Sequence, residues 1–141
     1  NTDILGSMEF ACKVAGSKLI VVLGHSKCGA VKGACDHVEM GNLTELLSKI
    51  QPAVYQEKDT TDNRTSKNSE FVENVAEINV KRSVKNIIER SFVLEQMLEE
   101  GQIGIVGAMH DIESGKVIFY DEVMYIKDEL NPEFTVAALK H

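Results

Sequence analysis

The chain has 141 residues, of which 43% are hydrophobic and 26% charged, and this length predicts a single domain over residues 1–141. The net charge of −7 argues against a nucleic-acid partner, and the longest apolar run, Leu19 to Leu23, is too short to cross a membrane. Three Cys residues and the lack of a signal pattern argue against a secreted disulfide scaffold, so we expect the cytoplasm or an organelle interior.

The N-terminal region predicts a helix followed by a buried strand. The helix is expected over Met8 to Ala15, with Ser7 as its N-cap and Gly16 as its left-handed end. The strand covers Lys18 to Gly24. Its five consecutive apolar residues, rich in β-branched types, are typical of a strand buried on both faces in a parallel sheet.

The next segment predicts two helical stretches and a polar loop. Gly29 to Cys35 is small and compatible with a helix, and Leu43 to Tyr55 is a further helical stretch that contains Pro52. Gln56 to Ser69 is polar throughout and has no large apolar residue. We expect this segment to be a solvated, mobile connection without chemistry of its own.

The C-terminal half alternates between helices and strands. Apolar residues at helical spacing predict helices over Glu70 to Arg90 and Phe92 to Glu100, and a last helix is expected over Glu133 to Lys140. The segments Ile103 to Met109 and Lys116 to Tyr120 are expected to form a hairpin, because a Glu-Ser-Gly turn lies between them.

These elements predict an α/β fold, with a mostly parallel sheet flanked by helices and an antiparallel edge hairpin. The sheet has few strands for its number of helices. A buried strand such as Leu19 to Leu23 needs a neighbour on each side, and the sequence provides only one. We therefore expect one edge of this strand to be open.

The chemistry-bearing residues of the sequence lie directly after this strand. His25 and Cys28 are three residues apart where the strand ends and a helix begins, so both side chains can converge on one point. Imidazole nitrogen and thiolate sulfur are favoured zinc ligands, and a helix N-terminus favours the thiolate. The small residue Gly29 would let a small substrate approach closely. Two ligands alone do not make a zinc site, and a buried Cys beside a hydrogen-bonded His is the structural alternative.

Five motifs, in order along the chain, resemble the β-class carbonic anhydrases. They are Gly6-Ser7-Met8-Glu9-Phe10-Ala11, the run from Leu19 to Val31, Glu77-Ile78-Asn79-Val80, the run from Gly104 to Asp111, and Ser114-Gly115-Lys116-Val117. The resemblance implies a zinc enzyme that interconverts carbon dioxide and bicarbonate, with His25 and Cys28 as two of three protein ligands. The family's zinc lowers the pKa of bound water, and the hydroxide attacks carbon dioxide. The resemblance also implies a homodimer or a higher homo-oligomer.

The chain departs from the family in one respect. The first zinc ligand of the family lies in a Cys-x-Asp-x-Arg motif, whose Asp and Arg form the catalytic dyad, and no such motif occurs here. We expect Cys12 to pack in the core, and Cys35 lies seven residues, about 10 Å along a helix axis, beyond Cys28. We therefore expect an N-terminally incomplete domain that lacks the family's first two strands and the dyad. The alternative is a non-catalytic relative or fragment that acts in assembly or anion binding.

Overall fold

The computed structural model describes residues 1–127, which divide into two compact units. The first unit comprises Asn1–Val22, Ser83–Ala108 and residues 119–127, and the second comprises Leu23–Arg82 and Met109–Ile118. The expected helix over Glu133 to Lys140 lies outside the described residues. No described helix combines the length and the apolar character that crossing a bilayer requires.

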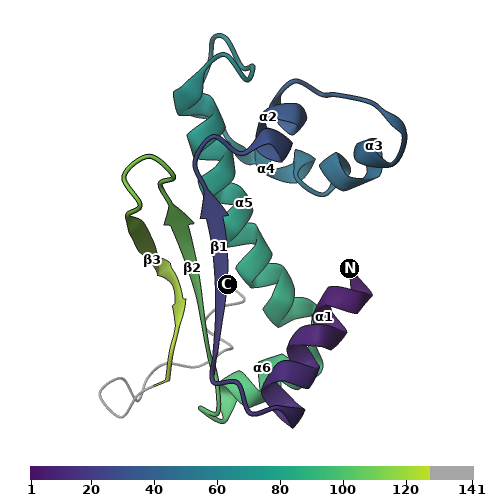
Figure 1. The fold of residues 1–141 in the computed structure, drawn as a ribbon, viewed down its shortest axis with the longest axis vertical. Coiled ribbons are helices and arrows are strands. Elements are labelled where there is room, and N and C mark those ends of the chain that lie inside the picture. Colours follow the sequence, from purple (N-terminus) through teal and green to yellow (C-terminus); the bar gives the residue numbers. More distant parts are fainter. Residues whose placement is uncertain (128–141) are drawn as a thin grey trace. The chain divides into compact units, whose positions relative to one another are not determined.

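The described strands form one three-stranded mixed sheet in the order β1-β2-β3 (Figure 1). The strands are β1 (Leu19–His25), β2 (Gly104–His110) and β3 (Val117–Tyr125). This arrangement confirms the predicted α/β fold and places each strand within two residues of its expected start.

Hydrogen bonds at the strand ends fix the directions of the strands. The amide of Gly104 donates to the Lys18 carbonyl, and the amide of Ser26 donates to the His110 carbonyl, each over 2.9 Å. Equivalent ends of β1 and β2 therefore lie together, so the two strands are parallel. A short turn follows β2 and leads back into β3, which forms the predicted antiparallel hairpin.

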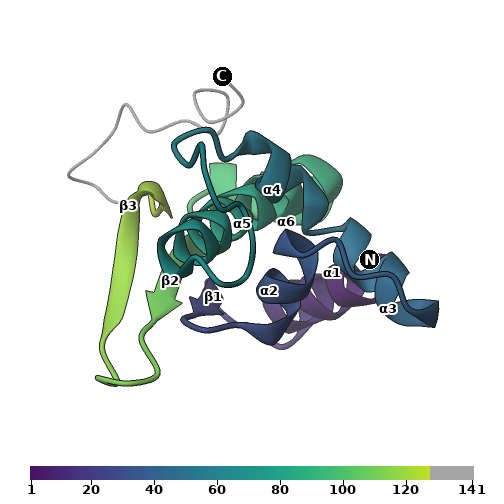
Figure 2. The same ribbon diagram turned by 90° about the horizontal axis from the view of Figure 1, so that it is seen from above.

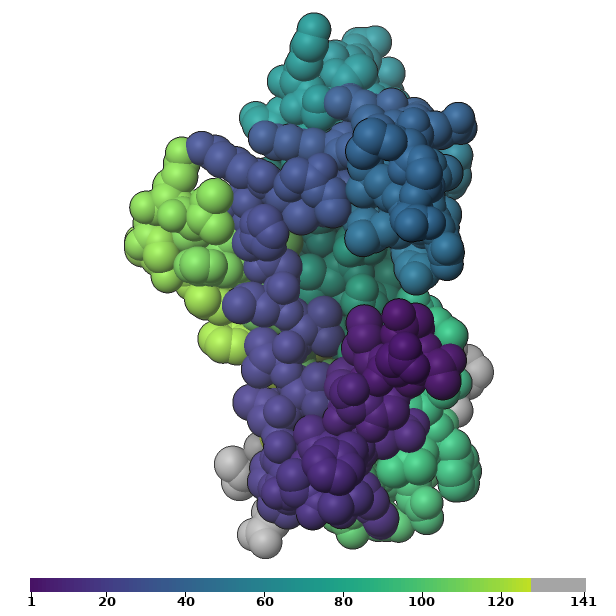
Figure 3. All heavy atoms as spheres, turned by 45° about the vertical axis from the view of Figure 1, so that its right-hand side comes forward, coloured from purple at the N-terminus to yellow at the C-terminus, as the bar shows by residue number. Residues whose placement is uncertain are grey.

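The strand β1 lies at one edge of the sheet in the part of the chain that the structure describes. Leu19, Val21 and Leu23 alternate along it and are 50%, 44% and 52% exposed. The segment that contains β1 is visible on the face of the molecule shown in Figure 3. The expected open edge is confirmed. The prediction that this strand is buried on both faces is wrong for the described residues, because the face that carries these three side chains stays exposed.

The first unit begins with α1 (Thr2–Glu9), which continues into a π-helical turn, η1 (Phe10–Val14). Asn1 caps α1, because its side chain accepts a hydrogen bond from the amide of Ile4 over 3.0 Å. Ser7 is not the cap. Its hydroxyl lies inside the helix and donates to the Asp3 carbonyl. Gly16 has a φ of +82° and ends the helical segment as predicted.

The core of the first unit joins helices to the sheet. The helix α6 (Phe92–Glu99) is capped by Ser91, whose hydroxyl accepts from the amide of Leu94 and donates to Glu9. The buried core residues come from η1, the second half of α5, α6, the residue directly before β2 and the strands β2 and β3; they are Cys12, Val84, Ile88, Leu94, Met97, Leu98, Ile103, Ile105, Val123 and Tyr125. The expected core position of Cys12 is therefore confirmed.

The second unit contains α2 (Gly29–Cys35), α3 (Gly41–Ser48), α4 (Gln51–Gln56) and most of α5 (Ser69–Arg90). The helices α2, α3 and α4 contact one another and form one group (Figures 1 and 2). The predicted single helix over Leu43 to Tyr55 is in fact two helices. Pro52 lies in the first turn of α4, where its missing amide proton costs no helical hydrogen bond.

Candidate functional site

His25 is the last residue of β1, and its imidazole is exposed. The ring nitrogen Nδ1 lies 2.9 Å from the carbonyl oxygen of Ser26. Because a carbonyl can only accept, Nδ1 donates in this bond, and Nε2 is the ring nitrogen that remains for a metal. This pattern is common for metal-binding histidines, whose second nitrogen donates to a backbone carbonyl.

Cys28 is the residue immediately before α2, and its thiol is reduced and half-buried. Gly29 is exposed at the first position of α2, and a Cβ atom built on it would meet nothing within 4 Å. The space beside Gly29 is therefore open. The predicted substrate contact at Gly29 stays a prediction.

The two residues between His25 and Cys28 are held by contacts from two other segments of the second unit. Lys27 has a φ of +57°, a left-handed conformation that non-glycine residues seldom adopt. Its amide donates to the Glu73 carboxylate of α5 over 3.3 Å, and its ammonium pairs with Glu113. The hydrogen bond and the charge of Glu113 raise the pKa of Lys27.

The hydroxyl of Ser26 makes two hydrogen bonds with the turn that follows β2. It donates to Asp111 Oδ1 over 3.3 Å and accepts from the amide of Ile112 over 3.0 Å. Asp111 also accepts from the amide of Glu113 through Oδ1 and from the hydroxyl of Ser114 through Oδ2. The bond from Ser114, followed by that from the amide of Glu113, lowers the pKa of Asp111.

The sequence did not identify Asp111 as a partner of the segment after β1. The available signal was its place directly after β2, because the carboxyl ends of adjacent parallel strands meet at one edge of a sheet. The pairing itself joins residues 85 positions apart in the chain. Periodicity within a short window does not detect such a contact.

The donor chemistry of His25 and Cys28 fits zinc, but the described residues do not complete a zinc site. Protein zinc sites use three or four side-chain ligands. Among residues 1–127, no three His, Cys, Asp or Glu side chains are grouped so that they could hold a metal ion. The described part of the chain thus offers two suitable donors in one turn and no third.

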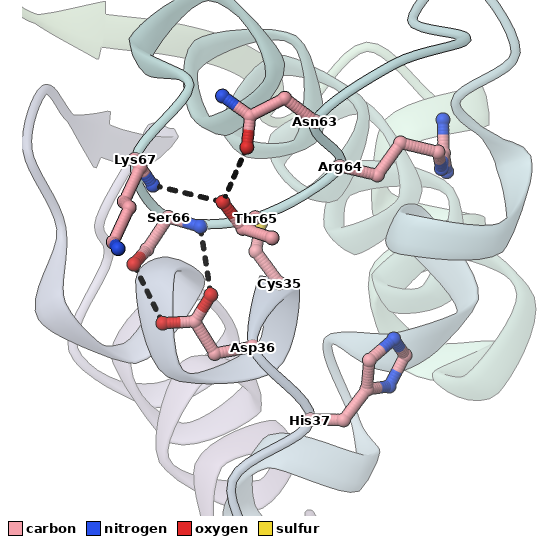
Figure 4. Close-up of a pocket in the computed structure, with 8 residues that line it drawn as sticks. All are labelled: Cys35, Asp36, His37, Asn63, Arg64, Thr65, Ser66 and Lys67. Carbon is pink, nitrogen blue, oxygen red and sulfur yellow. Dashed lines mark hydrogen bonds between the residues drawn. The ribbon is translucent and has the colours of Figure 1, made fainter.

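The described residues bring neither of the other cysteines into a three-ligand group with His25 and Cys28. Cys35, at the end of α2, is 1% exposed, and burial raises its pKa to about 11. It borders an open hollow of about 560 Å³, in which Asp36 points toward Ser66 and accepts hydrogen bonds from its amide and hydroxyl (Figure 4). His37 is exposed.

Relatives of known sequence share the greater part of this chain. A carbonic anhydrase of Mycobacterium tuberculosis is 27% identical over 92% of the chain, which covers 62% of that protein. A carbonic anhydrase of Mycolicibacterium smegmatis is 29% identical over 81% of the chain and 54% of that protein. The chain thus spans between about half and two thirds of the length of these relatives.

Solved structures share the fold. A β-carbonic anhydrase of Aspergillus fumigatus superposes with a TM-score of 0.69 at 26% identity and covers 96% of this chain and 64% of that one. A structure of tetrameric β-carbonic anhydrases from Sordaria macrospora gives a TM-score of 0.75 at 23% identity, with 86% of this chain and 61% of that chain covered. The family model for carbonic anhydrase matches residues 1–117. With the fold and this match together, the chain belongs to the β-class carbonic anhydrase family.

Proposed function

We propose that the protein carrying this chain catalyses the zinc-dependent, reversible hydration of carbon dioxide to bicarbonate and a proton. The observation that carries this proposal is the turn from His25 to Cys28 at the end of β1. There the Nδ1–H of His25 is satisfied by a backbone carbonyl, which leaves Nε2 for a metal. The family match over residues 1–117 supports the reaction class.

His25 and Cys28 are proposed as two zinc ligands, and Gly29 as a residue that borders the substrate. The 141 residues contain no Cys-x-Asp-x-Arg motif, which in the family supplies the third zinc ligand and the Asp–Arg dyad. We propose that they come from residues outside this stretch. The position of β1 at the edge of the described sheet supports this view, because a further strand can pair with the backbone of β1 there.

We propose that the protein forms a homodimer or a larger homo-oligomer. We also propose that it resides in a reducing compartment, either the cytoplasm or an organelle interior. The tetrameric state of the β-carbonic anhydrases from Sordaria macrospora supports the assembly. The three free cysteines support the compartment, because none of them is paired in a disulfide.

Metal analysis of the full-length protein, combined with a stopped-flow assay of carbon dioxide hydration, tests the proposal. We expect about one zinc per chain, and both zinc and activity lost in His25→Ala and Cys28→Ser. Cys35→Ser is the matched control, because it removes a buried thiol outside the turn and should keep its zinc. Stoichiometric zinc in Cys28→Ser would contradict the ligand assignment.

A second candidate is a non-catalytic relative that acts in assembly or anion binding. The incomplete donor set among residues 1–127 favours it. This candidate predicts a folded full-length protein that takes up no zinc and does not hydrate carbon dioxide. The same measurements therefore separate the two functions.

A further inference from the structure

We propose that Asp111 is a positioning residue for the pair His25 and Cys28 and that it acts through Ser26. This inference rests on the proposed zinc function, because it assigns to Asp111 the task of holding the two proposed ligands in a metal-binding arrangement. Asp111 is not proposed to touch the metal or the substrate. All residues in the argument belong to the second unit.

Asp111 is linked to Ser26 by hydrogen bonds. The Oδ1 atom of Asp111 accepts from the Ser26 hydroxyl, and that hydroxyl in turn accepts from the amide of Ile112. The backbone amide of Ser26 donates to the carbonyl of His110 over 2.9 Å. Ser26 is therefore tied to three consecutive residues of the segment that ends β2.

Ser26 is linked in turn to the two proposed ligands. The Ser26 carbonyl accepts the Nδ1–H of His25 and so fixes the plane of the imidazole and the nitrogen that stays free. Ser26 is also one of only two residues that separate His25 from Cys28. A movement of Ser26 changes the direction of the imidazole and the position at which the chain enters α2.

The backbone of this turn is also held in place. The left-handed conformation of Lys27 is one that the chain adopts only where its surroundings enforce it. The amide of Lys27 is held by Glu73 and its ammonium by Glu113, whose own amide binds Asp111 Oδ1. Asp111 thus joins the turn after β1 to the turn after β2 through both Ser26 and Glu113.

The test compares zinc affinity in full-length variants by competition with a chelator. We expect Asp111→Ala and Ser26→Ala each to weaken zinc binding by about tenfold or more, as for other residues that orient metal ligands. The double variant should bind zinc no more weakly than whichever single variant binds zinc less tightly, because both changes break the same linkage. Asp111→Asn keeps the Oδ1 acceptor and should stay within about threefold of wild type.

Ser66→Ala is the matched control. It removes an analogous Ser–Asp hydrogen bond, to Asp36, in the same unit but outside the turn, and it should leave zinc affinity unchanged. A second readout needs no metal. Hydrogen exchange of the metal-free protein should be faster at the amides of Ile112 and Lys27 in Ser26→Ala and Asp111→Ala, and unchanged there in Ser66→Ala.

Wild-type zinc affinity in Asp111→Ala, or additive losses in the double variant, would overturn the positioning role while the zinc function stands. A wild-type protein without zinc would overturn the zinc function itself, so the two failures are distinguishable. If Asp111→Ala does not fold, Ser26→Ala and Asp111→Asn decide the question through the same affinities. Loss of binding in Asp111→Asn equal to that in Ser26→Ala would also contradict the assignment of Oδ1.

Discussion

The Glu57 carboxylate and the Arg64 guanidinium form an ion pair in which Oε2 and Nη1 are 2.6 Å apart, and the Glu57 side chain is only 1% exposed. The second carboxylate oxygen accepts from the amide and hydroxyl of Thr60 and from the side-chain amide of Asn74. Both oxygens of the buried carboxylate are therefore satisfied, which is the condition for burying a charge at tolerable cost.

Replacing Arg64 is expected to destabilise the protein strongly. Arg64 also donates to the Val54 carbonyl and lies 4.5 Å above the Phe71 ring. Arg64→Ala leaves the Glu57 charge buried without its partner, so we expect a loss of about 3 kcal/mol in the free energy of unfolding, measured with urea. Lys58→Ala, at an exposed neighbouring position, should change it by less than about 0.5 kcal/mol. Equal effects of the two changes would contradict this interpretation.

The same carboxylate makes stability depend on pH. Burial acts to raise the pKa of Glu57, but hydrogen bonds from Arg64, Thr60 and Asn74 outweigh it and hold the pKa below its ordinary value. The stabilisation is complete above the unfolded carboxyl pKa of about 4.3 and is lost as the pH falls through the lower folded value. We expect wild type to lose more stability than Glu57→Gln between about pH 5 and pH 3. Parallel pH profiles of the two proteins would refute the expectation.

Gly24, directly before His25, has no room for a side chain. A Cβ atom there would lie 2.6 Å from Val80 Cγ2 and 3.0 Å from Met109 Cε. Val80 is stiff in its helix, so the strand must shift, and Gly24→Ala should cost about 1–3 kcal/mol. Gly29→Ala meets open space and should leave thermal stability nearly unchanged. A drop in kcat/KM for Gly29→Ala at constant stability would indicate a substrate contact.

The three thiols are expected to differ in reactivity. Burial raises the pKa of Cys12 and Cys35, the latter to about 11, and the thiolate is the reactive form. Cys28 is half-buried and should be alkylated first in the metal-free native protein, as peptide mapping by mass spectrometry can show. Zinc should slow that reaction selectively. Faster alkylation of Cys35 than of Cys28 would contradict the described burial.

The apolar edge of β1 predicts the solution behaviour of the isolated 141-residue chain. Exposed strands of this kind pair with other chains, so we expect concentration-dependent association in sedimentation experiments. Val21→Lys places a charge on the exposed face and should reduce the association, whereas the substitution Lys18→Arg should not. A monodisperse monomer at high concentration would count against the open edge.

The sequence predicted the elements whose signals are local. Two local signals were sufficient for this: the apolar run after Lys18 predicted β1, and the left-handed Gly16 predicted the end of the first helical segment. Asn1 and Ser7 are both good N-caps, and local preference alone did not distinguish them. Pro52 lies in the first turn of α4, whereas the sequence analysis placed it within one longer helix.

Features that depend on distant residues were not predictable in the same way. The polar composition from Gln56 to Ser69 suggested a solvated, mobile connection, whereas the structure buries Glu57 and binds it from α5 through Asn74. The strand β3 extends beyond the predicted Tyr120, because Val123 and Tyr125 are buried in the core despite the acidic residues before them. For the site, His25 and Cys28 remain predictions from spacing and family likeness.

The way Glu57 is satisfied has a consequence for how this segment opens. The partners of Glu57 are Thr60 and Arg64, which lie within residues 57–64, and Asn74, which lies in α5. Loss of any one of these contacts leaves the buried carboxylate short of a hydrogen-bond partner, which is costly. Local unfolding of residues 57–64 is therefore cooperative rather than gradual. We therefore expect residues 57–64 to resist proteolysis, despite their polar composition, until all hydrogen bonds to Glu57 break together.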